Sequence, residues 1–201
     1  MGIDVWEVIE AAKTKPFGFM AFYPGPGLGG HCIPIDPFYL SWRAKVFEMD
    51  ARFIELAGEI NRAMPRHVIQ NLSEALSERF RKSLNGARVL IMGVAYKKNI
   101  DDLRESPALR LIEILKDFGA EVAYHDPYCL EIPPTREHMP LAGMRSVAFD
   151  EATVSSFDAT LIATDHDSTD WSALTAWSKL VVDTRNATKR VEVGRDRIVL
   201  A

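Results

Sequence analysis

The spacing of hydrophobic residues changes near Gly86 and divides the chain into two regions. In the first region apolar residues recur at helical spacing, which predicts a helix within residues 1–14 that Asp4 could cap. The same spacing predicts long helices over residues 38–80, bent or broken near Pro65. Helices of this length seldom stand alone, so we expect them to pack on a partner chain or to bridge two domains.

The second region alternates buried-strand patterns with amphipathic helices. "ARVLIMGVAY" (87–96) predicts a strand, and residues 106–119 predict a helix with a serine cap, a proline in the first turn and a terminal glycine. Residues 120–127 predict the next strand, which completes a right-handed βαβ unit. Further strands are expected at 158–164, 179–185 and 197–200. The fold class is therefore α/β: a helical region followed by a small, doubly wound parallel sheet.

The segment "YPGPGLGGHCIPIDPF" (23–38) separates the two predicted helical stretches of the first region. Its glycines permit positive φ angles and close backbone approach, and with the neighbouring prolines they indicate a shaped loop. These glycines are Gly25, Gly27, Gly29 and Gly30. Cys32 follows at once and is predicted in the first turn of a helix, where the dipole favours a thiolate, with Asp36 four residues further on. The alternatives are a buried, inert Cys32 and a space-filling His31.

Charged residues follow the predicted strands, and the carboxyl ends of parallel strands are where ligands bind. "AYKKNIDDLRESP" supplies Lys97, Lys98 and Arg104 after the first strand, and later strands are followed by His125-Asp126-Pro127 and Asp183-Thr184-Arg185. Such basic residues suit a phosphate or diphosphate, although each one taken alone is more typical of a solvated loop charge. No GxGxxG follows the first strand, so the ordinary dinucleotide fingerprint is missing from this sheet.

Composition narrows the class of protein. The 201 residues include 47% hydrophobic and 26% charged residues, which is typical of one large or two small globular domains. A net charge of −4 without basic clusters argues against a nucleic-acid or anionic-membrane partner. Cys32 and Cys129 have no metal-binding spacing and fit reduced thiols, with Cys129 expected to be buried beside the second strand. No signal peptide or membrane span is apparent, so the expected location is the cytoplasm.

Three motifs together resemble one family. "PGPGLGGHCIPIDPFYL" resembles the catalytic-cysteine segment of the UDP-glucose/GDP-mannose dehydrogenase family, "GVAYKKNIDDLRESPAL" resembles its C-terminal nucleotide-binding segment, and "VVDTRN" resembles its late arginine motif. The three occur in the family's order, and the resemblance covers essentially the whole chain. It implies NAD-dependent oxidation of a sugar C6 alcohol to the uronic acid through a cysteine thiohemiacetal and thioester.

The resemblance also implies a domain layout. Residues 1–84 correspond to the central helical region, which dimerises in the family, and residues 85–201 correspond to the UDP-sugar-binding domain. The family's N-terminal Rossmann domain, which binds most of the NAD, is expected to be absent from this sequence. A homodimer through the central helix and a UDP-sugar substrate are the implied partners.

The family's functional residues can be carried over one by one. Cys32 matches the nucleophile and Asp36 the acid that assists water or proton transfer. Gly29, Gly30 and Tyr23 match the loop that approaches the substrate. Lys97 resembles the lysine at the UDP-sugar, Arg185 an arginine at the uridine nucleotide, and Arg104 an arginine that reaches NAD. No metal site is implied.

One departure bears on the substrate. Many UDP-glucose dehydrogenases carry a lysine directly before the acid, whereas this sequence has Ile35 before Asp36. The difference resembles the branch that acts on UDP-N-acetylhexosamines, particularly UDP-N-acetylglucosamine. UDP-glucose and UDP-N-acetylmannosamine remain alternatives, as does an inactive module that binds UDP-sugar and dimerises.

Overall fold

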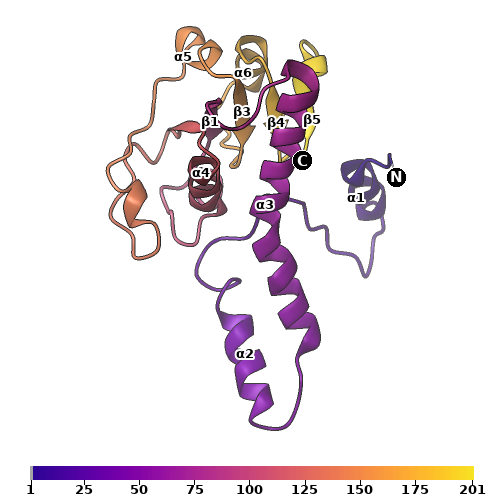
Figure 1. Cartoon of the computed structure of the whole chain (residues 1–201). Helices are drawn as coiled ribbons and strands as arrows, with labels where there is room; N and C mark the ends of the chain where they lie inside the picture. Colours follow the sequence, from indigo (N-terminus) through magenta and orange to yellow (C-terminus); the bar gives the residue numbers. More distant parts are fainter. Residues whose placement is uncertain (1) are drawn as a thin grey trace.

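The computed structural model describes residues 2–201. Three helices come first along the chain, and the strands, with further helices between them, follow (Figure 1). They are α1 (Val5–Lys13), α2 (Asp36–Lys45), α3 (Arg52–Phe80), β1 (Arg88–Met92), α4 (Pro107–Asp117), β2 (Glu121–His125), η1 (Met139–Leu141), α5 (Glu151–Ser155), β3 (Ala159–Ile162), α6 (Trp171–Trp177), β4 (Val181–Asp183), η2 (Arg195–Arg197) and β5 (Ile198–Leu200). The predicted α/β fold class is confirmed.

The sheet has five parallel strands in the order β2-β1-β3-β4-β5. Alternate residues of β1 point to opposite faces of the sheet. Val89 and Ile91 pack in the core that includes α3 and α4, and Leu90 and Met92 pack in the core that includes α5 and α6. Both faces are therefore covered, which explains why the strands read as continuous apolar runs.

Local signals place α4 and α1 as predicted. The Ser106 hydroxyl accepts a hydrogen bond from the Ala108 amide, Pro107 begins α4, and Gly119 follows its end with φ +81°. Asp4 caps α1 by accepting from the amide of Trp6 at 2.8 Å. These helix starts follow from short-range chemistry that sequence alone reveals.

The expected break near Pro65 is wrong, because α3 runs through Pro65 as one helix of 29 residues. The chain instead interrupts its helices at 46–51, after α2 has ended at Lys45, and Glu48 turns the chain there with φ +58°. A proline inside a helix costs about 3 kcal/mol, but each buried aliphatic side chain returns about 1.5 to 3 kcal/mol. The half of α3 that follows Pro65 buries several in the core: Val68, Ile69, Leu72, Ala75 and Leu76.

The α2–α3 hairpin extends away from the sheet (Figure 1) and carries an apolar surface that nothing in residues 2–201 covers. We call this set the hairpin apolar surface: Tyr39, Leu40, Trp42, Val46, Phe47, Met49, Phe53, Leu56 and Ile60. Among the described residues, no helix has both the length and the hydropathy that a membrane span requires.

Candidate active site

The glycine-rich segment crosses the carboxyl ends of the sheet and lies directly on the loop after β1. The Gly30 amide donates to the carbonyl of Arg104 at 2.9 Å. A Cβ added to Gly29 would lie 2.6 Å from Cβ of Tyr96 and from the carbonyl oxygen of Glu105. Gly30 has φ +86° and faces the Tyr96 ring, so a side chain at either glycine would push the segment off the loop.

The same segment also reaches the loop after β4, through Gly25. A Cβ on Gly25 would lie 2.8 Å from Cζ of Arg185, so the guanidinium rests on the backbone of this glycine. The Leu28 amide donates to the Asn61 side chain on α3 at 2.9 Å, which ties the segment to the long helix as well. The three resembling motifs therefore meet at one edge of the sheet.

Cys32 lies in this segment and is exposed, so the structure does not support the alternative of a buried thiol. The first-turn prediction is also wrong: α2 begins at Asp36, and Cys32 occupies the turn before it, where its carbonyl accepts the Asp36 amide at 2.8 Å. Within residues 2–201, no hydrogen bond joins the Asp36 carboxylate to the thiol. His31, beside Cys32, is exposed.

Two hollows flank the cysteine segment. One, of about 740 Å³, is mainly apolar and lies between the segment, α3 and α4, with Leu28, Ile33 and Asn61 in its wall. The other, of about 710 Å³, is lined by His31 and Arg104 among others. Cys32 lines neither hollow, but its two neighbours in the sequence do: Ile33 lines the first and His31 the second.

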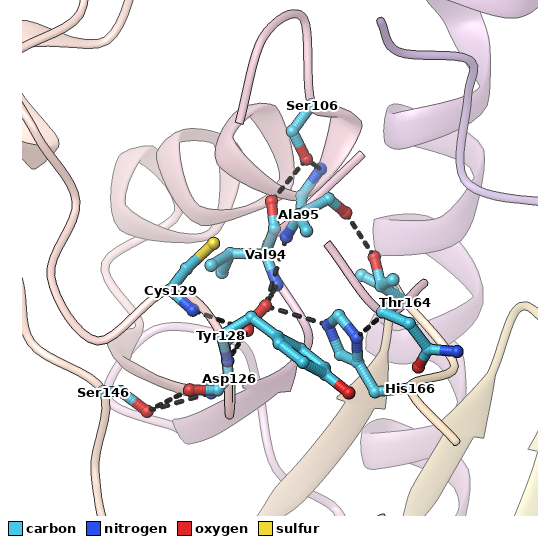
Figure 2. Close-up of polar contacts among 12 residues, drawn as sticks. Val94, Ala95, Ser106, Asp126, Tyr128, Cys129, Ser146, Thr164 and His166 are labelled. Atoms are coloured by element: carbon cyan, nitrogen blue, oxygen red, sulfur yellow. Dashed lines mark hydrogen bonds and ion pairs between the residues drawn. The ribbon is translucent and has the colours of Figure 1, made fainter. Parts of the chain in front are cut away.

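The loop after β1 is fixed by a buried carboxylate, Asp126 (Figure 2). One oxygen of Asp126 accepts from the amides of Val94 and Ala95, at 2.7 and 3.2 Å, and from Nε2 of His166 at 3.0 Å. Its other oxygen accepts from the amides of Tyr128 and Cys129. Burial alone would raise the pKa of Asp126, but the His166 bond and these amides outweigh it and lower the pKa to about 2.

Hydroxyl groups satisfy the carbonyls of the same loop. Ser106 donates to the Val94 carbonyl at 2.7 Å, and Thr164 donates to the Ala95 carbonyl at 2.6 Å (Figure 2). Every backbone polar group of these two residues is thus engaged, so the loop has one well-defined path.

Of the basic residues predicted to face a phosphate, two are paired inside the chain. Lys98 bonds to Asp167 at 2.9 Å, and Arg104 makes a bidentate pair with Asp102. The Asp102 carboxylate raises the pKa of Arg104, with smaller contributions from Tyr96 and Cys32. Lys97 is exposed and has no ion pair among residues 2–201.

Arg185 is partly buried and is held through its Nε, which donates to the Ala163 carbonyl at 2.9 Å. Burial lowers the pKa of Arg185, and the charges of Asp165 and Asp183 oppose this effect. Asp183 also shapes the turn, because it accepts the amides of Arg185 and Thr188. The hydrogen bonds found in residues 2–201 leave the two terminal guanidinium nitrogens available for an anion.

Tyr23, two residues before Gly25, packs against side chains of α1. Its hydroxyl bonds to Glu10 at 3.0 Å and to the ammonium of Lys13 at 3.1 Å, and its ring stacks on Trp6. In this structure, therefore, α1 fixes the orientation of Tyr23.

The sheet does not fit a dinucleotide. In a Rossmann site the amides after the first strand bind a pyrophosphate, whereas here the amides of Val94 and Ala95 are bonded to Asp126. Gly93, with φ +78°, packs so closely on Thr164 that a Cβ would lie 2.6 Å from the threonine Cβ. Its conformation therefore serves internal packing of the loops.

Sequence reasoning missed three residues of this site. Tyr96 supports the two glycines, Asn61 holds the segment from α3, and His166 joins two loops. Tyr96 lies inside a motif that sequence singled out, but nothing in the sequence marks Asn61 or His166, because each contacts a segment more than thirty residues away.

Comparison with known proteins agrees with this arrangement. The model of the "UDP-glucose/GDP-mannose dehydrogenase family, UDP binding domain" matches residues 90–190, and that of the family's central domain matches residues 1–63. The chain is 36% identical over 198 residues to UDP-N-acetyl-D-mannosamine dehydrogenase of Pyrococcus horikoshii, covering 96% of this chain and 43% of the relative. It is 38% identical over 128 residues to UDP-N-acetyl-D-glucosamine 6-dehydrogenase of Pseudomonas aeruginosa, covering 64% of this chain and 30% of that protein.

Solved structures match the fold along its full length. The P. horikoshii UDP-D-ManNAc dehydrogenase structure superposes with a TM-score of 0.79 at 34% identity, covering 99% of this chain and 44% of that one. The Methanosarcina mazei NDP-N-acetyl-D-galactosaminuronic acid dehydrogenase superposes with a TM-score of 0.82 at 27% identity, covering 100% of this chain and 44% of that chain. The chain thus spans less than half the length of these relatives. On the two family models and these matches, the chain belongs to the UDP-glucose/GDP-mannose dehydrogenase family.

Proposed function

We propose that this chain is the UDP-sugar-binding and catalytic-cysteine portion of an NAD-dependent nucleotide-sugar 6-dehydrogenase. The observation that carries the proposal is the meeting of the cysteine segment with both nucleotide-binding loops, through Gly29 and Gly30 on Tyr96 and through Gly25 on Arg185. In this proposal residues 1–84 form the helical and catalytic-loop part, and residues 85–201 bind the nucleotide.

The diphosphate and uridine are held by the basic side chains at the strand ends. Lys97 is the basic residue of the first loop without an internal carboxylate partner in residues 2–201, which supports its contact with a phosphate. Arg185 offers two free guanidinium nitrogens in a fixed orientation, which suits bidentate binding. Tyr23 is proposed to reach the sugar, which requires it to leave its bonds to Glu10 and Lys13.

Cys32 provides the covalent step. Its thiolate attacks the C6 aldehyde carbon, a C–S bond forms, and the carbonyl oxygen takes a proton to give a thiohemiacetal. In this class of reaction NAD⁺ would accept one hydride when the C6 alcohol becomes the aldehyde, and a second when the thiohemiacetal loses a hydride and a proton to become the thioester. This chain would contribute Arg104 to cofactor binding, because its own sheet does not fit a dinucleotide. Water then cleaves the thioester, returning the thiol and the uronic acid, with Asp36 as the base that activates the water.

The substrate is proposed to be a UDP-N-acetylhexosamine. Ile35 in place of a lysine supports this branch, and UDP-N-acetylglucosamine was the expectation from sequence. UDP-N-acetylmannosamine is the second candidate, favoured by the similarity to the P. horikoshii enzyme.

The assembly is proposed to be a homodimer in the cytoplasm, formed through the hairpin apolar surface. A surface of nine large apolar side chains supports a protein partner, because a solvated helix pair would carry polar residues there.

The test measures binding and turnover by the same polypeptide. Titration calorimetry with UDP, UDP-N-acetylglucosamine and UDP-N-acetylmannosamine is expected to show binding that Arg185→Ala weakens. NADH formation that is lost in Cys32→Ser establishes the dehydrogenase, whereas UDP-sugar binding without NADH formation supports the alternative of a binding and dimerisation module. No binding of any of the three ligands contradicts the proposal.

A further inference from the structure

His166 is buried between the loops that follow β2 and β1. Its Nε2 lies 3.0 Å from a carboxylate oxygen of Asp126, and its Nδ1 lies 2.9 Å from the backbone nitrogen of Asn99 (Figure 2 shows the Asp126 side of this contact). The side chain is 1% exposed, so it can act on a ligand only through the residues that it holds.

The two contacts fix the tautomer of the ring. The Asn99 backbone N–H can only donate, so Nδ1 must present its lone pair. The ring proton therefore lies on Nε2 and is donated to Asp126. With its proton on Nε2 and a lone pair on Nδ1, the imidazole joins the buried Asp126 carboxylate to the backbone amide of Asn99.

The amide of Asn99 lies at the end of residues 96–99, the segment that carries Lys97, the residue proposed to bind a phosphate. Asn99 has the left-handed φ of +63°, and its side chain exchanges two hydrogen bonds with Asp167, one of 2.6 Å to the carboxylate and one of 3.0 Å from the amide. At the other end Asp126 holds the amides of Val94 and Ala95. Lys97 lies between these two attachments.

We propose that His166 is a positioning residue for nucleotide binding: by accepting the Asn99 amide it sets the path of residues 96–99 and so the place of Lys97. This inference rests on the proposed UDP site. The Tyr96 amide is also held, by the Asp102 carbonyl at 3.0 Å, on the side of Lys97 that faces Ala95 in the sequence. On the other side of Lys97 the backbone is held by the bond from the Asn99 amide to His166, which runs through a single side chain.

Two substitutions separate the two bonds of the ring. In His166→Asn the amide oxygen stands near the position of Nδ1, so the bond from Asn99 is kept and the bond to Asp126 is lost. In His166→Gln the amide nitrogen stands near Nε2, so the bond to Asp126 is kept and the acceptor for Asn99 is lost. Both variants are expected to lower the melting temperature, since each breaks one buried hydrogen bond.

The UDP dissociation constant of the 201-residue chain, measured by calorimetry, then distinguishes positioning from mere structural support. We expect about a three- to tenfold increase in His166→Gln and less than a twofold change in His166→Asn. In a Lys97→Ala background the His166→Gln effect is expected to vanish, because a double-mutant cycle isolates the lysine through which the histidine acts. Nitrogen-15 spectra of the imidazole are expected to show the Nε2–H tautomer.

An unchanged dissociation constant in folded His166→Gln, a fully additive cycle with Lys97→Ala, or an Nδ1–H tautomer would each overturn the inference while leaving the UDP site intact. If the unsubstituted chain binds no UDP, the proposed function fails and the inference fails with it. Should His166→Gln not fold, the nitrogen-15 spectrum of the unsubstituted chain still decides, because an Nδ1–H tautomer excludes the bond from the Asn99 amide and overturns the inference without any variant.

Discussion

The guanidinium of Arg185 lies on the backbone of Gly25, with its Cζ 2.8 Å from where a Cβ at residue 25 would stand. A residue of the cysteine segment and a residue of the loop after β4 are thus in direct contact, although they lie 160 positions apart in the sequence. The placement of the arginine therefore depends on the absence of a side chain at residue 25.

Gly25→Ala is expected to displace the Arg185 guanidinium and to raise the UDP dissociation constant about three- to tenfold. It is also expected to cost about 1 kcal/mol of stability, because the displacement breaks the Nε bond to the Ala163 carbonyl. Gly143→Ala is the matched control: that residue has φ +82° and open space around it, so alanine should cost about 1 kcal/mol and leave UDP binding unchanged. Calorimetry and urea unfolding of both variants check that similar losses of stability accompany different UDP affinities. Equal UDP affinities in the two variants would contradict it.

Arg185→Lys is expected to weaken UDP binding by about tenfold to a hundredfold. Lysine keeps the charge but loses the planar pair of donors and the Nε bond to the Ala163 carbonyl. Arg190→Lys, at an exposed residue of the same loop region, provides the control and should bind UDP normally. Unchanged UDP affinity in Arg185→Lys would show that only the positive charge at this residue matters, and would contradict bidentate binding by the guanidinium.

One thiol per chain is expected to react with iodoacetamide under native conditions. Cys32 is exposed, whereas Cys129 is buried, and that burial raises the pKa of its thiol to about 12. Mass spectrometry should find one label on the native chain, two in urea, and none on native Cys32→Ser. Rapid native labelling of Cys129 would contradict the packing of residue 129 beside Asp126.

Acid should destabilise the chain through Asp126. The pKa of this carboxyl is about 2 in the folded chain, against an ordinary value of 3.8, so folding favours the ionised form. Its contribution, about 2 kcal/mol, is complete above pH 4 and is lost as the pH falls toward 2. Urea unfolding between pH 5 and about pH 2 is expected to show this extra loss in the unsubstituted chain and in Asp117→Asn, an exposed control, but not in Asp126→Asn. Parallel pH curves for all three would refute the assignment.

Phe53→Glu is expected to shift the chain from dimer toward monomer in light scattering at micromolar concentration. Phe53 is 89% exposed on the hairpin apolar surface, so burying a charge there opposes association without disturbing the core. Glu78→Lys, on the exposed part of α3 beside the sheet, should leave the mass unchanged. A monomeric unsubstituted chain would rule out the dimer.

Sequence predicted those parts of the fold that depend on neighbouring residues. The start of α4 was predictable because Ser106 and Pro107 act within one turn, and β1 because its apolar run is uninterrupted. The path of α3 was not, because its continuity through Pro65 depends on burial against the sheet. His166 was hidden for a similar reason: in "TDHDSTD" it reads as an exposed loop residue, and only folding brings Asp126 to it.

The continuity of α3 has a mechanical consequence. A helix of 29 residues is roughly 43 Å long, and this one begins in the hairpin and ends inside the core of the α/β domain. Its helical course continues through Pro65, so one continuous helix joins the hairpin to the core. A tilt imposed at the hairpin by a partner would therefore be delivered to the sheet edge and, through Asn61 and Leu28, to the turn that carries Cys32.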